Sequence, residues 1–552
     1  MASFALLCFL LWAAACQPSL SPVGGVSPPP TVLTPAAPIA SPLPETWLDV
    51  LAPEGWAPFE RAMILEARED VAWAVETLRP TRYVIDARFD PVARRVTGRE
   101  MVRYVNNESV PLDAVYFRLF PNLPGFGHAE ISSLTVDGVL MSPEVELGGS
   151  ALRVPMMPPL VPGQVVTFEL SFTVDVPAEP GPNYAALSYI DDVLALAGFY
   201  PSIPVYDDEG WNVEAPPSYG DVVYADVSFY LVRFTLPAGW KIAASGSALA
   251  VEDNRDGTAT WTLVTGPMRD FNLVASPLYE VSEARVGSTT VRSFYKPEDE
   301  AGGRRALDYA AWALRYFSET FGAYPFAELD VAATPTSAGG IEYPGLIVIA
   351  DHLYGLRGGF FEWAVVHETA HQWWYGLVGS DQVDEPWLDE ALAQYATLMY
   401  MEAKYGRIAA AAAREAAFER PYRQLIKEGR DQPVGQPVSA FSEADYGPIV
   451  YAKGPLFFHE MRRAMGDDAF RAFLRVYLSR YRYRIATPEG LLAVAQETCH
   501  CDLTPIYAKW ILGATSADPD AIPPSLMDDL ANMPSCLSET CSFSLDSPRL
   551  AQ

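Results

Sequence analysis

The clearest chemical pattern in the sequence is His-Glu-x-x-His, formed by His367, Glu368 and His371. Residues four apart lie on one face of an α-helix, so the two imidazoles can bind the same zinc ion. The carboxylate of Glu368 lies beside the first imidazole, where it can activate a water at the metal without being a ligand. The alternative is a helix with two structural histidines and a solvated glutamate. The pattern favours zinc-assisted hydrolysis.

A catalytic zinc site uses three protein ligands, so the two histidines leave one position to fill. Eighteen residues separate His371 from Glu390, which lies near the start of a second amphipathic segment, Trp387–Tyr395. Glu390 would complete the His-His-Glu set of thermolysin-type enzymes. The alternative is an exposed glutamate favoured by the helix dipole. Asp389 can support a ligating histidine, but a solvated carboxylate is the simpler interpretation.

Two kinds of region must position these residues. Tyr83 to about Lys296 contains β-branched and aromatic segments separated by Gly, Pro and Asn, which predicts a mostly antiparallel β domain. From residue 297 the pattern changes, and Ala306–Phe321 carries apolar residues at the three- and four-residue steps of a helix. Two strands and then mainly helices are expected after it, at 329–333, 345–350 and 360–512. The sequence therefore predicts a multidomain α+β protein with a catalytic domain at 297–515.

The His-Glu-x-x-His pattern and the glutamate eighteen residues later resemble peptidase family M1, the zinc aminopeptidases that include aminopeptidase N and leukotriene hydrolase. Two further segments are similar to that family. Gly339-Gly340-Ile341-Glu342-Tyr343 resembles its Gly-x-Met-Glu-Asn exopeptidase motif, and Tyr451-Ala452-Lys453-Gly454 resembles the segment that holds its catalytic tyrosine. The resemblance extends from about Tyr83 to Leu512, and it implies a thermolysin-like catalytic domain.

The resemblance also implies roles for these residues. One zinc ion would be bound by the three ligands named above, and Glu368 would be the general base. Glu342 would bind the free α-amino group of a peptide substrate, while the backbone at Gly339 and Gly340 would form the edge strand along which the peptide lies. Tyr451 would hydrogen-bond the oxyanion. Taken singly, Glu342 is also compatible with a loop carboxylate and Tyr451 with a packed aromatic residue.

The sequence departs from the family pattern in several places. Tyr343 replaces the Asn of the exopeptidase motif, and Ile341 replaces its Met. We find no clear counterpart of the N-domain Gln that helps to bind the amine. The long helical C-terminal domain of larger members has no counterpart after Leu512, so a more open cleft is expected. Two other classes therefore remain: a zinc endopeptidase or other hydrolase on this scaffold, and a non-catalytic, surface-tethered binding protein.

The amino terminus predicts export. Phe4–Ala15 is an apolar run too short for a permanent membrane helix, and it ends in small residues before Cys16. Residues 1–16 are therefore expected to be a signal peptide. Ala-Ala-Ala-Cys also resembles a bacterial lipoprotein cleavage site, which leaves open a lipid anchor at Cys16. Residues 17–44 predict a Pro/Ser/Thr-rich tether and 45–82 a short helical lead-in. The expected location is extracellular or at the cell surface.

Charge and cysteine content restrict the partners and the redox environment. A net charge of −30 argues against nucleic acid or an anionic membrane surface as a partner, and no later segment has eighteen uninterrupted apolar residues. Two disulfides that fasten the tail at 516–552 are expected, with the pairing open. Cys499-His500-Cys501 can alternatively begin a metal site, although its spacing is not Cys-x-x-Cys. The four cysteines concerned are Cys499, Cys501, Cys536 and Cys541.

Overall fold

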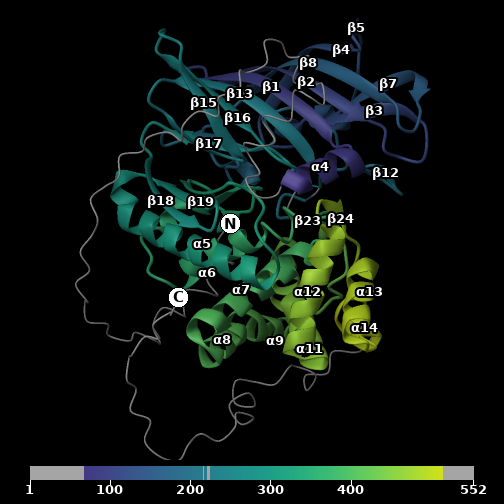
Figure 1. Ribbon diagram of the computed structural model, residues 1–552, viewed down its shortest axis with the longest axis vertical. Helices are drawn as coiled ribbons and strands as arrows, with labels where there is room; N and C mark the ends of the chain where they lie inside the picture. The colour runs from purple at the N-terminus through teal and green to yellow at the C-terminus, as the bar shows by residue number, and fades with distance from the viewer. Residues whose placement is uncertain (1–67, 216, 221–223, 514–552) are drawn as a thin grey trace, which may run out of the picture.

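The computed structural model describes residues 68–215, 217–220 and 224–513 (Figure 1). The expected signal peptide with Cys16, the tether, most of the helical lead-in, and the tail with Cys536 and Cys541 lie outside these residues. Figure 1 shows a β domain at the top and a helical domain below it, with helix α4 (Arg68–Thr77) between them. Within the described residues, no helix is both long and apolar enough to cross a membrane.

A large sheet forms the N-terminal domain and accounts for its core. Strand β8 (Val165–Asp175) alternates strictly between buried and half-buried residues, as expected where only one face of a sheet is packed. All neighbouring strands pair antiparallel except β1 and β13, which are parallel. In spatial order the strands are β15 (Ser247–Asp253), β16 (Thr258–Val264), β13 (Ser228–Pro237), β1 (Thr81–Asp90), β2 (Arg95–Val105), β8 (Val165–Asp175), β4 (His128–Val136) and β5 (Val139–Leu140).

Smaller sheets cover this one and complete the domain. The aromatic and aliphatic side chains between them form one buried cluster, which includes Tyr83, Phe168 and Phe234. One small sheet has β3 (Leu112–Arg118), β7 (Ala151–Leu160) and β6 (Glu144–Glu146). A second has β14 (Lys241–Ala244), β17 (Leu273–Ser276), β10 (Val193–Leu196) and β9 (Leu187–Ile190), and a third has β11 (Tyr206–Asp207) and β12 (Gly210–Trp211).

A five-stranded sheet begins the catalytic domain and corrects its predicted boundary. Strands β18 (Glu280–Val286) and β19 (Thr289–Tyr295) were expected in the β domain. Instead β19 pairs in parallel with β20 (Glu328–Thr334), which pairs with β22 (Leu346–Ala350). The boundary therefore lies before residue 280 rather than at 296. The sheet ends in β21 (Gly340–Ile341), an edge strand antiparallel to β22.

Helices pack against this sheet and against one another. Helix α5 (Glu300–Thr320) covers β18 and β19. Helix α6 (Phe360–Ala370) lies between α5, α7 (Trp387–Tyr405) and β22. Because α6 is enclosed in this way, nearly all of its residues are buried. The other helices are α7 (Trp387–Tyr405), α8 (Arg407–Arg414), α9 (Arg420–Lys427), α10 (Glu443–Tyr446), α11 (Gly454–Met465), α12 (Asp467–Tyr481), α13 (Pro488–Cys499) and α14 (Thr504–Trp510).

The cysteines near the C-terminus pair differently from the prediction. Cys499 and Cys501 are bonded to each other, with their Cα atoms 5.1 Å apart. Neither residue can therefore fasten the tail, and neither is available as a metal ligand. Two cysteines separated by one residue can close a small local loop, which in this chain lies at the end of α13.

The buried side chain of Arg269 joins the two domains. It comes from the β domain and donates hydrogen bonds to the carbonyl oxygens of Tyr375, at 2.5 Å, and Arg484, at 2.9 Å. Gly379 lies against it, because a Cβ atom there would be 2.2 Å from the guanidinium carbon. Tyr375 has a positive φ of 137°, which is strained for a residue with a side chain. Arg269 thus holds the strained segment that follows α6.

We predict that Arg269→Met destabilises the protein strongly, since it leaves several buried carbonyl groups without a donor. The expected loss is about 3–5 kcal/mol of unfolding free energy, measured by urea denaturation. Arg95→Met is the control, because Arg95 forms an exposed pair with Asp175 and should contribute less than about 1 kcal/mol. Equal unfolding midpoints for the two variants would contradict this interpretation of Arg269.

Candidate metal centre and active site

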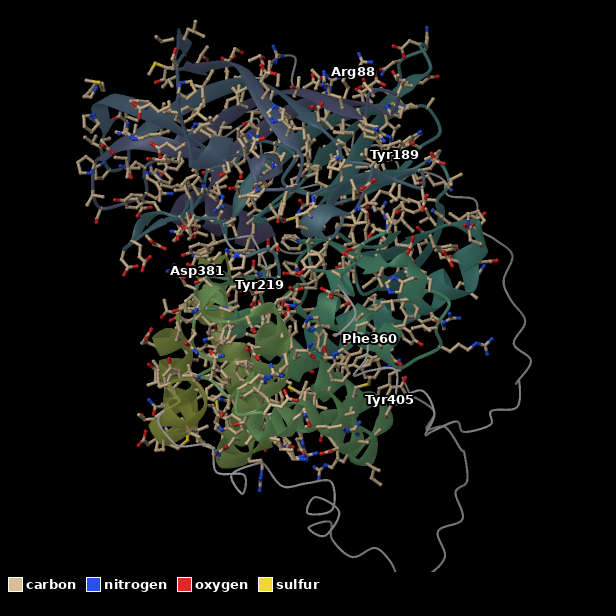
Figure 2. All side chains as sticks on the ribbon, turned by 180° about the vertical axis from the view of Figure 1, so that it is seen from behind. Arg88, Tyr189, Tyr219, Phe360, Asp381 and Tyr405 are labelled. Atoms are coloured by element: carbon tan, nitrogen blue, oxygen red, sulfur yellow. A yellow bond between two sulfur atoms is a disulfide. The ribbon has the colours of Figure 1, made fainter. Side chains whose placement is uncertain are left out.

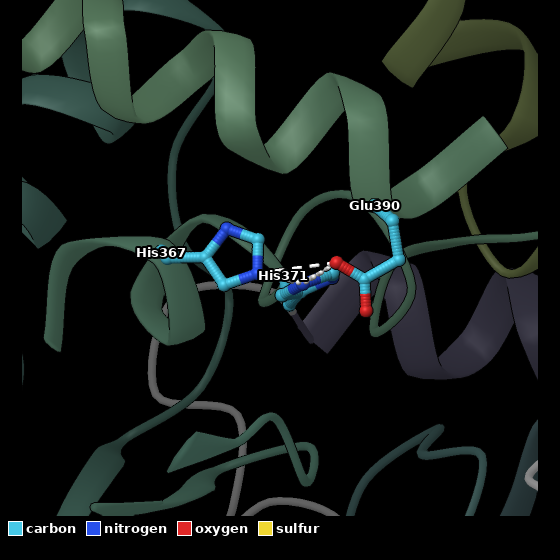
Figure 3. A group of neighbouring side chains, drawn as sticks. All are labelled: His367, His371 and Glu390. Carbon is cyan, nitrogen blue, oxygen red and sulfur yellow. Dashed lines mark hydrogen bonds and ion pairs between the residues drawn. The ribbon is translucent and has the colours of Figure 1, made fainter. Parts of the chain in front are cut away.

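Helices α6 and α7 bring the three expected metal ligands together. His367 lies in the last turn of α6, His371 follows directly after it, and Glu390 lies in the first turn of α7. The Nε2 atoms of the two imidazoles are 3.2 Å apart. Oε2 of Glu390 lies 3.2 Å from the first Nε2 atom and 3.5 Å from the second. Figure 3 shows the three side chains pointing toward one another.

These donors fit a zinc ion. Ligand atoms about 2.0–2.1 Å from a tetrahedral zinc lie about 3.3–3.4 Å from one another, which agrees with the three distances above. All three side chains are buried, and Oε2 of Glu390 accepts no hydrogen bond from any other described group. A buried carboxylate oxygen between two imidazole nitrogens requires a cation. Two nitrogen donors and one oxygen donor suit zinc.

Neighbouring groups orient the ligands. Nδ1 of His371 lies 2.9 Å from the carbonyl oxygen of Trp374, so it donates its proton there and leaves Nε2 free for a metal. Oε1 of Glu390 accepts a hydrogen bond of 2.6 Å from the hydroxyl of Tyr451. Tyr451 comes from the π-helical segment Gly447–Lys453, and its ring centroid is 6.1 Å from that of His367. The tyrosine therefore lies at the metal centre rather than in a distant aromatic core.

Glu368 lies against Gly340, in the segment 339–343 that resembles the exopeptidase motif. A Cβ atom on Gly340 would be 2.5 Å from Oε1 of Glu368, so this position requires a glycine for close approach. Gly339 packs in turn against the ring of Phe360, 3.1 Å from a Cβ atom placed there. Burial raises the pKa of Glu368 well above its usual range, and the nearby carboxylate of Glu342 raises it further. A buried carboxyl group thus lies beside the metal ligands and β21.

Glu342 follows the edge strand β21 and is 7% exposed. Its Oε1 atom accepts a hydrogen bond of 3.3 Å from Nε2 of Gln382. Burial raises the pKa of Glu342, whereas the nearby His371 lowers it. The loop that follows is fixed by Gln372, which donates to the carbonyl of Tyr343. This places a buried carboxylate beside an open strand edge and close to the metal ligands.

Asp389 was expected to be solvated, and that expectation is wrong. The side chain is 2% exposed because the first turn of α7 is enclosed by the metal centre and its loops. Its Oδ1 atom accepts from the backbone N–H of Glu390 at 2.7 Å, and its Oδ2 atom accepts from Gln382 at 2.5 Å. Burial, with the adjacent Glu390 carboxylate, raises its pKa to about 8. Among the described contacts, Asp389 makes no hydrogen bond to a ligating histidine.

A cavity of about 2670 Å³ lies between the domains and reaches the metal centre. Its walls include Gly339 to Tyr343, parts of α6 and α7, and loops of the β domain. Figure 2 labels Tyr219, Phe360 and Asp381, which are among its lining residues. The sequence did not point to Gln372 or Gln382, whose only signal was their place between the expected ligands. The cavity is large enough for a peptide.

Comparison with known proteins shows which family part of this chain resembles. Residues 305–510 match the peptidase family M1 domain. Aminopeptidase M1-B of Oryza sativa subsp. japonica is 25% identical over 412 residues, which are 67% of this chain and 45% of the relative. Aminopeptidase N of Lactococcus lactis subsp. lactis is 25% identical over 293 residues, which are 47% of this chain and 32% of the relative. The chain thus spans less than half the length of these curated relatives.

Solved structures extend the similarity to the whole fold. The M1 zinc metallopeptidase from Deinococcus radiodurans is 22% identical, with a TM-score of 0.62. The match covers 81% of this chain and 97% of that one. The predicted α+β multidomain fold is therefore confirmed. The family and the His-His-Glu group together identify zinc as the metal. On these grounds residues 305–510 form a domain that is similar to peptidase family M1.

Proposed function

We propose that this chain is a zinc-dependent aminopeptidase that removes N-terminal residues from peptides. The observation that carries the proposal is the group of three metal donors, two of which, His367 and Glu390, line the same cavity as Glu368 and Glu342. The names of the relatives support it, since both curated proteins described above are aminopeptidases. A structure of the Deinococcus radiodurans protein is described as bound to a Tyr-Ser-Ala substrate.

Each residue has a distinct part in the proposed reaction. His367, His371 and Glu390 would hold a zinc ion, which would supply a Lewis acid for the scissile carbonyl and for a water. Glu368 accepts a proton from the attacking water and later delivers it to the leaving amine. The hydroxyl of Tyr451 donates a hydrogen bond to the oxygen on which negative charge develops. For this it must turn from Glu390, which accepts its hydrogen bond in the structure.

Recognition of the chain end depends on Glu342 and β21. The substrate would add as a strand to the open edge of β21, so that backbone hydrogen bonds hold it along the sheet. The carboxylate of Glu342, directly after this strand, would pair with the α-ammonium group. Because Glu342 is buried, an uncharged or acetylated amine would leave its charge without a partner. Cleavage then occurs one residue from the free end.

Glu368→Ala tests the reaction. We expect the variant to retain about one zinc per chain, measured by elemental analysis, because Glu368 is not among the metal donors. Its kcat on an aminoacyl p-nitroanilide should fall by about 10²–10⁴-fold, since general acid–base catalysis is lost. Glu497→Ala, at an exposed pair with Arg480, serves as the control. Full activity of Glu368→Ala would exclude this mechanism.

Glu342→Ala tests the exopeptidase assignment. We expect kcat/KM for a substrate with a free amine to fall by about 100-fold, because a buried ion pair to the substrate is lost. For the N-acetylated form of the same substrate the change should be less than about threefold. A parallel loss for both substrates would instead favour a zinc endopeptidase. The measurement is steady-state kinetics on matched free and blocked pairs.

We further propose that the protein is exported, to the extracellular space or the cell surface, and that Cys16 is a site of lipid attachment. The apolar segment before Cys16 supports export. The Cys499–Cys501 disulfide is in keeping with an oxidising compartment.

Mass spectrometry of the mature protein tests this localisation. Cleavage before Cys16 with an added lipid mass is the expected result, because the preceding alanines suit a lipoprotein signal. An intact N-terminus in the cytoplasmic fraction would contradict export. Cleavage without lipid would contradict the anchor alone.

A further inference from the structure

Gln382 contacts two buried carboxylates with one amide group. It lies in the loop between α6 and α7 and is 1% exposed. Its Nε2 atom is 3.3 Å from Oε1 of Glu342 and 2.5 Å from Oδ2 of Asp389. The Oε1 atom of Gln382 has no hydrogen-bond partner among the described residues. The amide nitrogen of Gln382 thus donates to two acids, while its amide oxygen accepts no hydrogen bond from the described residues.

The orientation of this amide follows from its neighbours. The amide nitrogen of Gln382 faces both acids, so its NH₂ group donates to Oε1 of Glu342 and to Oδ2 of Asp389. Its two hydrogens serve one acid each. The contact to Asp389 connects this pair to the metal centre, because the other oxygen of Asp389 accepts from the backbone N–H of Glu390. A continuous chain of hydrogen bonds therefore runs from Glu342 to the first turn of α7.

A second buried glutamine fixes the backbone of the same segment. Oε1 of Gln372 accepts from the N–H of Gly345 at 2.8 Å, and its Nε2 atom donates to the carbonyl of Tyr343 at 3.1 Å. Because Gln372 holds the backbone beside Glu342, Gln382 is left to determine where the carboxylate points. Gln372 thus fixes the backbone beside Glu342, and Gln382 orients the carboxylate of Glu342.

The choice of a neutral donor has a chemical consequence. An arginine or lysine beside Glu342 would orient the carboxylate but would also neutralise its charge, and would compete with a cationic ligand. An amide orients the carboxylate and leaves the charge in place. Glu342 also has the carboxylates of Glu390 and Glu368 nearby, and a neutral donor adds no further charge to this group.

We propose that Gln382 is a positioning residue for recognition of the substrate's α-ammonium group, acting by holding the carboxylate of Glu342 toward the cavity. The inference rests on the proposed aminopeptidase function, because it takes Glu342 as the partner of the ammonium group. It assigns to the loop between the metal-binding helices a role in selecting substrates with a free N-terminus, in addition to joining those helices.

The experiment compares Gln382→Met, Gln382→Glu, Glu342→Ala and the double variant Glu342→Ala/Gln382→Met as zinc-loaded proteins. Methionine keeps the length of the side chain but removes both donors, whereas glutamate adds a third carboxylate to the pair. Gln164→Met, in an exposed turn of the β domain, is the matched control. For each protein, kcat and KM are measured on a free aminoacyl p-nitroanilide and on its N-acetylated form. Zinc content and the urea midpoint are measured on the same samples.

We expect Gln382→Met to raise KM for the free substrate by about tenfold, with kcat changed by less than about threefold. Its preference for free over blocked substrate should fall by the same factor, and Gln382→Glu should lose more. Gln164→Met should match the parent. The double variant should be no worse than Glu342→Ala, because Gln382 acts through Glu342. A merely structural role would lower activity on both substrates equally and would add to the effect of Glu342→Ala.

The outcomes separate the two claims. If Glu342→Ala abolishes the preference for free amines and Gln382→Met leaves it unchanged, the role of Gln382 is wrong and the proposed function stands. If Glu342→Ala itself keeps the preference, the proposed amine site fails and this inference fails with it. Should Gln382→Met not fold, the same comparison is made with Gln382→Glu, and an unchanged preference in that variant also overturns the proposal.

Discussion

The structure depends on the packing of several buried acids around two imidazoles. Burial and mutual repulsion both oppose ionisation of carboxylates, so such a group requires compensation by cations or by directed hydrogen bonds. A zinc ion between the ligands offsets much of this repulsion, and buried amide donors offset more. In the described part of the chain, the crowded side chains are Glu342, Glu368, Asp389, Glu390, His367 and His371.

The surroundings of the site are closely packed. Helix α6 is enclosed by the sheet and by two helices, so nearly all of its residues are buried. Gly340 allows the edge strand to approach Glu368, and Gln372 holds the loop after that strand. Arg269 then fixes the chain just beyond α6 to the β domain. The cavity between the domains is therefore built on the same contacts that hold the metal ligands.

The sequence predicted the parts of the site that follow from local spacing. Helical periodicity places His367 and His371 on one face, and the gap before Glu390 matches a helix, a turn and a second helix. The sequence did not predict the features that depend on contacts between residues far apart in the chain. The strands at 280–295 look locally like those of the β domain, and only pairing with β20 assigns them to the other sheet. Similarly, Gln382 forms a hydrogen bond with Glu342, 40 residues away in the sequence, and no local pattern predicts this contact.

X-ray absorption spectroscopy at the zinc edge tests the assignment of the metal ligands most directly. Its fine structure, recorded on the purified, zinc-loaded protein, gives the types of ligand atom and their distances from the metal. We expect one zinc per chain with two imidazole nitrogens and oxygen ligands at about 2.0–2.1 Å, and no sulfur. The same spectrum of His371→Ala should lose one imidazole contribution. A sulfur shell at about 2.3 Å, or a parent spectrum unchanged in His371→Ala, would contradict the assignment of His367, His371 and Glu390 as the ligands.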